Sequence, residues 1–308
     1  MPTRRVDQLE RNFDTMHLDR SRIPTLLAAV LLLGSQPTAA QSVFHVMGQD
    51  IKNSVGDAWD VWTSPLRGTS RDWLTAAGAV GASAAVTPWD DDVDRWAVKQ
   101  QNDAFWSWLK EFREGGAAFS GQQITPVALG LYAVGLLAHS PPLREGLVGC
   151  ATAYGATSVV RTFVVYPLVA RTRPDSGHSV HLPPAKSGDQ YDFSVPGTTN
   201  WGRHSFPGGH ITNVAACAAF LTERYDMGIA APLPWLVVGA VAIGRTLDRR
   251  HWVSDQMIGG LFGYAVGKEI ALRSFRRSKR KPAASPSHGS LSIVPAPGGV
   301  ALRWSLDY

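Results

Sequence analysis

The sequence predicts an all-α protein, a compact bundle of about six core helices with a candidate β-hairpin near the C-terminus. Apolar segments rich in Ala and Gly are separated by clusters of Gly, Pro and Asp. Small residues allow helices to pack closely. Strand signals are nearly absent before the last twenty or so residues. With 44% hydrophobic residues among 308, the chain can bury one large core or two small ones.

The expected helices follow one another with few interruptions. The acidic run "WDDDVDRW" (89–96) favours a helix start, because carboxylates are favourable near a helix N-terminus, and this is simpler than a divalent-cation site. The run "LSIVPAPGGVALRWSL" (291–306) contains two short strand-like pieces around a turn and is the hairpin candidate. The helices are expected at 73–86, 92–113, 124–138, 146–166, 210–224, 233–246 and 252–272.

Composition divides the chain into four parts. Residues 1–40 are expected to be an export signal peptide, and 41–72 an entry segment that packs on the body. Residues 73–277 form the helical domain, and 278–308 a basic, Pro- and Ser-rich linker with the C-terminal tail.

The export signal is predicted from the order of its parts. Arg20 and Arg22 precede a short apolar run at 23–34, and small residues follow at Thr38 and Ala40. A basic region, a short apolar region and a small-residue cleavage site are typical of an exported protein. An uncleaved N-terminal anchor is the alternative.

The net charge of +5 comes mainly from one segment. Six of the ten residues in "RSFRRSKRKP" (273–282) are basic, and without them the chain is close to neutral. Such a run is usually a solvated tail. No aromatic or Gly-rich repeat accompanies it, so no nucleic-acid partner is expected.

Length alone does not predict a membrane span. The apolar run 124–138 is about fifteen residues long, below the ~18 that indicate a span, and Arg161 interrupts another apolar run. The basic run after 256–272 is typical of a cytoplasmic flank. We expect an exported protein of the periplasm or cell envelope, either soluble or membrane-associated.

Two cysteines, Cys150 and Cys217, lie in Ala- and Gly-rich apolar segments. An exported protein permits a disulfide, but cysteines on separate helices are more often buried small hydrophobic residues. We expect the latter, and there is no zinc-type spacing.

The stretch "GRTLDRRHWVSDQMIGG" (244–260) carries the strongest chemical pattern. His251 and Asp255 are four residues apart at the start of an amphipathic helix, so they share a face. An Asp that accepts the proton of one imidazole nitrogen leaves the other nitrogen free to attack. Arg245 precedes them in the same stretch.

Two further stretches complete an inventory for displacement at phosphorus. "RTRP" (171–174) supplies two guanidinium groups, and "SFPGGHITN" (205–213) places His210 at a glycine-flanked helix start that suits an anion. One histidine can attack while the other protonates the leaving oxygen, and the arginines hold the charge. This inventory requires no metal.

The three stretches resemble those of the type 2 phosphatidic acid phosphatase (PAP2) superfamily, which shares its site with bacterial acid phosphatases and vanadium haloperoxidases. The resemblance covers about 160–256 and implies the family's helical core. It implies that His251 is the nucleophile that becomes phosphohistidine, Asp255 its orienting partner and His210 the general acid. Further implied roles are phosphate binding by Arg173, Arg245 and the backbone of Gly208 and Gly209.

The sequence departs from the family pattern at three positions. Gly208 replaces the usual serine, so we expect weaker oxyanion binding through a remaining backbone N–H. Tyr166 stands where the family has a lysine; Arg161 could replace that cation if Pro167 distorts the helix, and Arg171 is the other substitute. Gly244 replaces a serine at the start of the third stretch.

Other histidines are not expected in the site. The segment "PDSGH" (174–178) contains Ser-Gly-His, but loop residues follow it, so "PGGH" is the better match. The histidines expected in loops or on the surface are His139, His178, His181 and His204.

We therefore expect an exported, metal-independent phosphatase that needs no cofactor and acts on phosphate monoesters or lipid phosphates. The resemblance leaves two alternatives open. One is a haloperoxidase with vanadate as cofactor; in a phosphatase vanadate would be an inhibitor. The other is a catalytically impaired anion-binding protein of the envelope.

Overall fold

The computed structural model describes residues 37–100, 103, 106, 124–175, 185–198, 200–280, 290–296 and 299–305. The chain divides into two compact units, Met1–Asn53 and Ser54–Tyr308. Helix α3 (Pro37–Thr63) begins in the first unit, and the features below belong to the second. The expected export signal lies outside the described residues except for its last four, which are helical.

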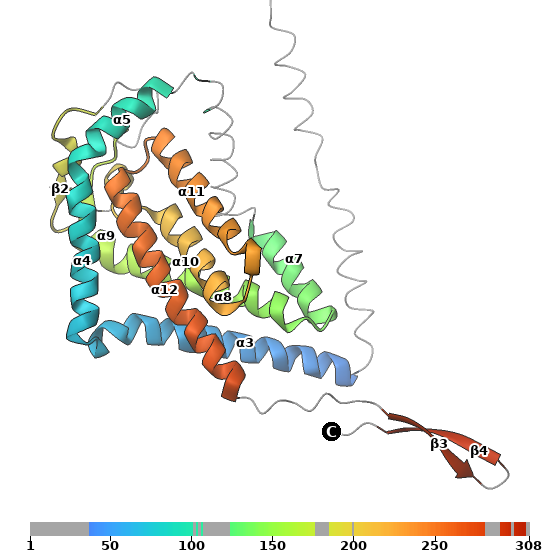
Figure 1. Cartoon of the computed structure of the whole chain (residues 1–308). Helices are drawn as coiled ribbons and strands as arrows, with labels where there is room; N and C mark the ends of the chain where they lie inside the picture. Colours follow the sequence, from blue (N-terminus) through green and yellow to red (C-terminus); the bar gives the residue numbers. More distant parts are fainter. Residues whose placement is uncertain are drawn as a thin grey trace, which may run out of the picture. The chain divides into compact units, whose positions relative to one another are not determined.

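The second unit is predominantly helical, which confirms the predicted all-α class (Figure 1). The only strands among the described residues form two small antiparallel pairs, and the second pair is the expected hairpin. The strands are β1 (Ala170–Arg171) with β2 (Phe193–Ser194), and β3 (Ser290–Ala296) with β4 (Gly299–Ser305). The helices after α3 are α4 (Ser70–Val86), α5 (Asp90–Lys99), α7 (Ile124–Leu137), α8 (Pro141–Val160), α9 (Tyr166–Leu168), α10 (Gly209–Arg224), α11 (Pro232–Leu247) and α12 (Val253–Arg280).

Helix α8 is distorted just before Pro167. A π-helical turn, η4 (Arg161–Val165), connects α8 to α9 and so continues the helix to Leu168. Proline lacks a backbone N–H and disturbs the preceding turn, as expected from the sequence. Such single π turns recur at functional sites.

The expectation of a solvated basic tail is wrong for its first part. Helix α12 continues through the basic run to Arg280. Arg277 pairs with Asp57 of α3 at 2.7 Å (Nη2 to Oδ2), and Arg273 pairs with Asp60. The two arginines are four residues apart, so they share the helix face that meets α3.

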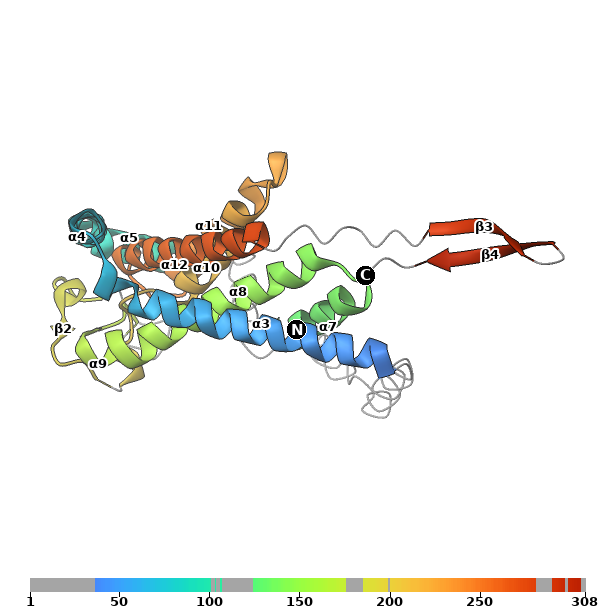
Figure 2. The same cartoon turned by 90° about the horizontal axis from the view of Figure 1, so that it is seen from below.

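Helices α10 and α12 lie side by side and approach each other unusually closely (Figures 1 and 2). On α12, the glycines at 259, 263 and 267 are spaced by four and form one stripe. A Cβ at Gly263 would lie 2.2 Å from the carbonyl oxygen of Thr212, and one at Gly267 would lie 2.0 Å from that of Ala216. We call this contact the glycine seam; only residues without a Cβ fit there.

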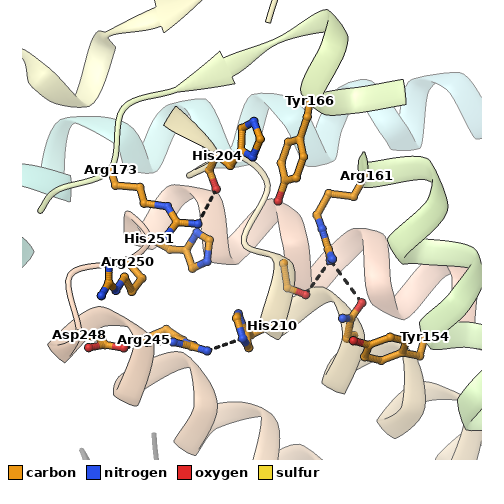
Figure 3. Close-up of a pocket in the computed structure, with 12 residues that line it drawn as sticks. Tyr154, Arg161, Tyr166, Arg173, His204, His210, Arg245, Asp248, Arg250 and His251 are labelled. Carbon is orange, nitrogen blue, oxygen red and sulfur yellow. Dashed lines mark hydrogen bonds and ion pairs between the residues drawn. The ribbon is translucent and has the colours of Figure 1, made fainter. Parts of the chain in front are cut away.

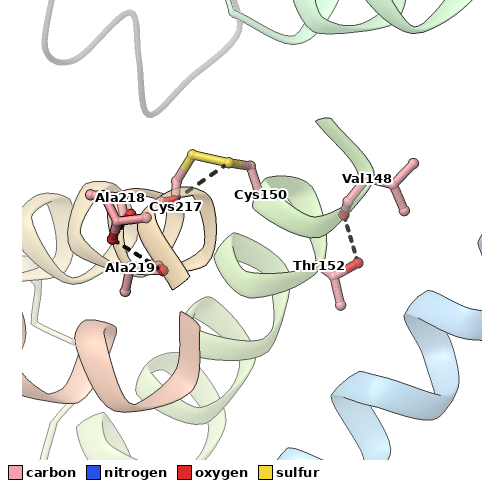
Figure 4. The surroundings of a disulfide bond; sticks show 7 residues. Val148, Cys150, Thr152, Cys217, Ala218 and Ala219 are labelled. Carbon is pink, nitrogen blue, oxygen red and sulfur yellow. Dashed lines mark hydrogen bonds between the residues drawn. A yellow bond between two sulfur atoms is a disulfide. The ribbon is translucent and has the colours of Figure 1, made fainter. Parts of the chain in front are cut away.

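A disulfide joins Cys150 of α8 to Cys217 of α10, which corrects the expectation of two free, buried thiols (Figure 4). The two Cα atoms lie 4.5 Å apart across the helix pair. The sequence places both residues on helices but does not say that they face each other.

Two described helical segments are long and apolar enough to cross a membrane, Pro141–Leu168 and Gly228–Leu247. Only 22% and 11% of their most apolar windows are buried within the protein, whereas the core helix of a soluble protein is mostly buried. Apolar side chains such as Phe163, Leu233 and Leu236 are exposed. The first of these segments was not expected to be a candidate span because Arg161 interrupts its apolar run.

We expect Gly263→Ala to lower stability by about 1–3 kcal/mol, because the new methyl group overlaps the α10 backbone. Thermal unfolding of the full chain in detergent measures this change. The control is Gly78→Ala on α4, where a Cβ meets no atom within 4 Å and a better helix former is introduced. Equal melting temperatures for the two variants would contradict the seam.

Candidate active site

The ends of four helices surround a cavity of about 500 Å³. Helix α8 with its π turn ends there, α10 begins there, α11 ends there and α12 begins there (Figure 3). The lining is rich in guanidinium and imidazole groups. Its residues are Tyr154, Arg161, Tyr166, Arg173, His204, Gly209, His210, Asn213, Arg245, Asp248, Arg250 and His251.

His251 lies in the connection between α11 and α12 and is 4% exposed. Its Nδ1 lies 2.7 Å from the carbonyl oxygen of Ser205. A carbonyl oxygen only accepts, so Nδ1 carries the proton and Nε2 keeps its lone pair. Burial and the nearby Arg173 lower the pKa of His251 well below its ordinary value, so the ring is neutral. A neutral imidazole with a free Nε2 is a competent nucleophile.

Asp255 does not bond to His251 as the spacing predicts. One carboxylate oxygen (Oδ2) accepts from the Ser205 hydroxyl at 2.5 Å and from the Trp252 N–H at 3.3 Å; the other (Oδ1) accepts from Arg171 at 2.6 Å. Asp255 is the third residue of α12, so its side chain reaches back to the helix start. It therefore acts on His251 through Ser205, whose hydroxyl it holds and whose carbonyl orients the ring.

His210 is the second residue of α10, and its ring centre lies 6.4 Å from that of His251. An Nη2 atom of Arg245 donates to its Nε2. Burial, then the positive charges of Arg245, Arg161 and Arg173, lower the pKa of His210 to about 3. The ring is therefore neutral, and an anion among these guanidinium groups would raise its pKa.

Arg161 enters the cavity from the π turn. Its Nη1 lies 3.0 Å from the carbonyl oxygen of Gly209 and 3.3 Å from Oδ1 of Asn213. These contacts hold the guanidinium against the start of α10. Of the two residues expected to replace the family lysine, Arg161 is the one that lines the cavity.

Arg173 and Arg245, both expected to bind phosphate, line the opposite part of the cavity (Figure 3). Arg173 donates to the carbonyl oxygen of His204 at 3.3 Å, and burial lowers its pKa to about 10, so it is still a cation at neutral pH. Arg245 donates to Asp248 at 3.1 Å with its other terminal nitrogen.

Arg171 is not a phosphate ligand in this structure. It is 1% exposed and does not line the cavity. Its two terminal nitrogens pair with Asp90 at 2.7 Å and with Asp255 at 2.6 Å. Two buried carboxylates therefore neutralise its charge, and the expectation that Arg171 binds phosphate is wrong.

Gly208 also lies outside the cavity lining, in contrast to Gly209. Its N–H donates to the carbonyl oxygen of Asp255 at 2.9 Å, so it is not free for phosphate. A Cβ there would lie 3.0 Å from Ile211 Cγ2 and 3.2 Å from Asp255 O. Gly208 therefore belongs to the α10–α12 contact, where a side chain would be tight.

His204 was expected in a loop or on the surface, but it lines the cavity. Its ring stacks on Tyr166 with centres 4.1 Å apart, and its Nε2 lies 2.6 Å from the carbonyl oxygen of Thr198. No sequence signal marked it. The other lining residues that sequence reasoning missed are Tyr154, Asn213, Asp248 and Arg250.

The segment "PDSGH" (174–178), the poorer match to the family pattern, is described only as far as Asp175, which pairs with Arg250 at 2.8 Å. His178 and His181 lie outside the described residues. Among the described residues, no group of three or more His, Cys, Asp or Glu is placed to hold a metal ion.

Comparison with known proteins gives two matches. Residues 146–279, from α8 to the end of α12, match the PAP2 superfamily model. A comparison with curated proteins gives no match. Among solved structures, the chain is similar to one described as the first transmembrane PAP2 type phosphatidylglycerolphosphate phosphatase from Bacillus subtilis. The identity is 19% and the TM-score 0.43, over 68% of this chain and 96% of that one.

Acid is expected to destabilise the protein through His210. Its pKa is about 3 in the folded chain against an ordinary 6.5, so below pH 6.5 the unfolded chain binds a proton that the folded chain refuses. Stability is therefore lost as the pH falls, by about 1 kcal/mol at about pH 5.5. Chemical unfolding at several pH values measures the slope. His210→Gln should reduce it, whereas the exposed control His139→Asn should not.

Proposed function

We propose that this chain, whose residues 146–279 match the PAP2 superfamily model, is a metal-independent phosphatase working through a phosphohistidine at His251. The observation that carries the proposal is the oriented, neutral imidazole of His251. Its Nδ1–H is fixed by Ser205, and it lines a cavity with His204, His210 and four guanidinium groups. This set can attack phosphorus, protonate a leaving group and hold negative charge.

In the first step, Nε2 of His251 attacks phosphorus and the bond from phosphorus to the leaving oxygen breaks. His210 gives its proton to that oxygen, so an alcohol leaves. Arg161, Arg173 and Arg245 hold the three non-bridging oxygens, with the N–H groups at the start of α10. In the second step, His210 takes a proton from water, which attacks phosphorus, and the bond from phosphorus to His251 breaks.

Arg245 couples phosphate binding to the protonation of His210. In the arrangement described above it donates to Nε2 of His210, which must therefore be unprotonated there. A phosphoryl oxygen competes for the same guanidinium. Once Arg245 turns to the phosphate, Nε2 can take the proton that the leaving group needs, and the anion offsets the charges that lower its pKa.

The substrate is a phosphorylated lipid or a phosphorylated small molecule, and the first is favoured by the outer surface of the helices. Pro141–Leu168 and Gly228–Leu247 both end at the cavity, only 22% and 11% of their most apolar windows are buried, and apolar side chains such as Phe163 and Leu236 are exposed. A substrate with its chain in a bilayer would present its headgroup at that end.

We place the cavity on the exported side of the membrane. Helix α12 starts at the cavity and runs 28 residues to its basic end, about 42 Å away at 1.5 Å per residue. This exceeds the roughly 30 Å of bilayer hydrocarbon. Clustered Arg and Lys favour the cytoplasmic side, so the opposite end faces out. The disulfide between α8 and α10 is in keeping with this placement.

Purified full chain in detergent should release phosphate from an aryl phosphate with chelator present, and His251→Ala should abolish release. His210→Ala should slow alkyl phosphates about 10²–10⁴-fold but affect 4-nitrophenyl phosphate least, because its leaving group needs no proton. Vanadate should inhibit.

The matched control is His139→Asn, an exposed histidine in the α7–α8 turn, which should keep full activity. Undiminished turnover in His251→Ala would sink the mechanism. Vanadate-dependent halide oxidation without phosphate release would identify a haloperoxidase instead. Anion binding with no turnover on soluble or lipid esters would identify an impaired member.

Phosphate binding should take up a proton at His210, because the bound anion raises the pKa of that ring from about 3. Affinity for inorganic phosphate should then fall as the pH rises through the pKa of the bound state. Titration calorimetry near pH 6, in buffers of different ionisation enthalpy, counts the protons. His210→Gln should remove about one of them; equal counts in both proteins contradict the coupling.

A further inference from the structure

Helix α5 buries three carboxylates of its acidic run, those of Asp90, Asp91 and Asp94. Asp90 and Asp94 are four residues apart and share one face, and they are 1% and 5% exposed. Asp92 points the other way, its side chain 65% exposed beside Arg95. A helix-start preference for acidic residues explains Asp92, but burying a carboxylate is costly unless it is paired. The pairing partners of Asp90 and Asp94 are therefore informative.

Asp94 holds Arg249, two residues before His251. Its Oδ1 accepts from Nε of Arg249 at 2.7 Å and its Oδ2 accepts from Nη2 at 3.1 Å, a two-bond fork with both side chains buried. Arg249 has φ = 55°, a left-handed conformation that is unfavourable for a non-glycine residue. The fork therefore holds the backbone in a conformation that it would not otherwise prefer.

Asp90 holds the chain on the other side of His251. It accepts from the N–H of Ser254 at 3.0 Å and from its hydroxyl at 2.5 Å. It also pairs with Arg171, which binds the Asp255 carboxylate that holds Ser205. One helix thus fixes residues 249 and 254, and His251 lies between them. Neither carboxylate lines the cavity.

We propose that Asp94 and Asp90 of α5 are positioning residues, which act through Arg249 and Ser254 to aim Nε2 of His251 at phosphorus. This inference rests on the proposed phosphatase function. The step it affects is the attack by His251, whereas proton donation by His210 does not involve α5.

The test compares Asp94→Asn and Asp90→Asn with Asp92→Asn in the full chain. All three remove one negative charge from the same helix, and the third is the exposed control. We expect the first two to lower kcat about 10–100-fold with little change in KM, because misplacing a nucleophile by an ångström has this effect. The loss should be the same for aryl and alkyl phosphates, in contrast to His210→Ala. Unchanged kcat in properly folded Asp94→Asn and Asp90→Asn, or a loss that grows with the leaving-group pKa, overturns the proposal.

A second readout does not need turnover. ¹⁵N-histidine spectra of the full chain, with the His251 signal assigned from His251→Gln, report which ring nitrogen carries the proton. We expect this signal to lose its Nδ1–H character in Asp94→Asn and to keep it in Asp92→Asn; no difference overturns the proposal. Asp94→Glu keeps the charge but displaces the fork, and should show the same changes if Asp94→Asn fails to fold. If the wild type releases no phosphate, the proposed function fails, while the spectra still decide the role of α5.

Discussion

The site depends on how closely the backbones of α10 and α12 approach each other. Glycines at every fourth position of α12 leave no side chain between the helices, so α12 contacts the carbonyl groups of α10 directly. At the end of this seam, the N–H of Gly208 bonds to the carbonyl of Asp255. The two helix starts are thereby fixed against each other. Because His210 is at one start and His251 just before the other, their rings face the same small cavity.

The arginines near the cavity fall into two groups, those buried beside it and those that line it. This difference explains how the site keeps its positive charge. Arg171 and Arg249 are fully buried, and carboxylates of α5 and α12 neutralise them. Arg161, Arg173, Arg245 and Arg250 line the cavity, although Arg245 also pairs with Asp248 and Arg250 with Asp175. Arg171 and Arg249 fix the surrounding helices, while burial first, and then the charges of Arg173 and Arg245, lower the pKa of both histidines and keep the rings neutral.

In the structure, Asp255 does not orient His251 by a direct hydrogen bond, although their spacing predicts one. Asp255 and His251 are four residues apart, yet their connection runs through the hydroxyl and carbonyl of Ser205. The nucleophile is therefore oriented by backbone, and the carboxylate fixes that backbone. A carbonyl has no titratable proton, so in this arrangement the tautomer of His251 does not depend on the ionisation of a direct carboxylate partner.

Local pattern was enough for much of the fold, because helix starts, proline positions and apolar periodicity are properties of neighbouring residues. By itself the sequence determined the all-α class and the helices that became α10 and α11, and it named Pro167 as a place where the helix could be distorted. It also singled out Arg161, Arg173, His210, Arg245 and His251, all of which line the cavity.

The remaining features were decided by the tertiary structure alone, because they depend on which segments, distant in the sequence, come into contact. It separated Arg161 from Arg171 as the cation of the cavity, joined Cys150 to Cys217, and turned Gly208 from a phosphate donor into a packing position. It also brought the carbonyl of Ser205 to His251. Every residue has a backbone carbonyl, so the sequence does not indicate which carbonyl will accept a hydrogen bond from His251. Likewise, the type of a side chain does not indicate which helix it will contact. For this reason no spacing in the sequence could have identified these contacts.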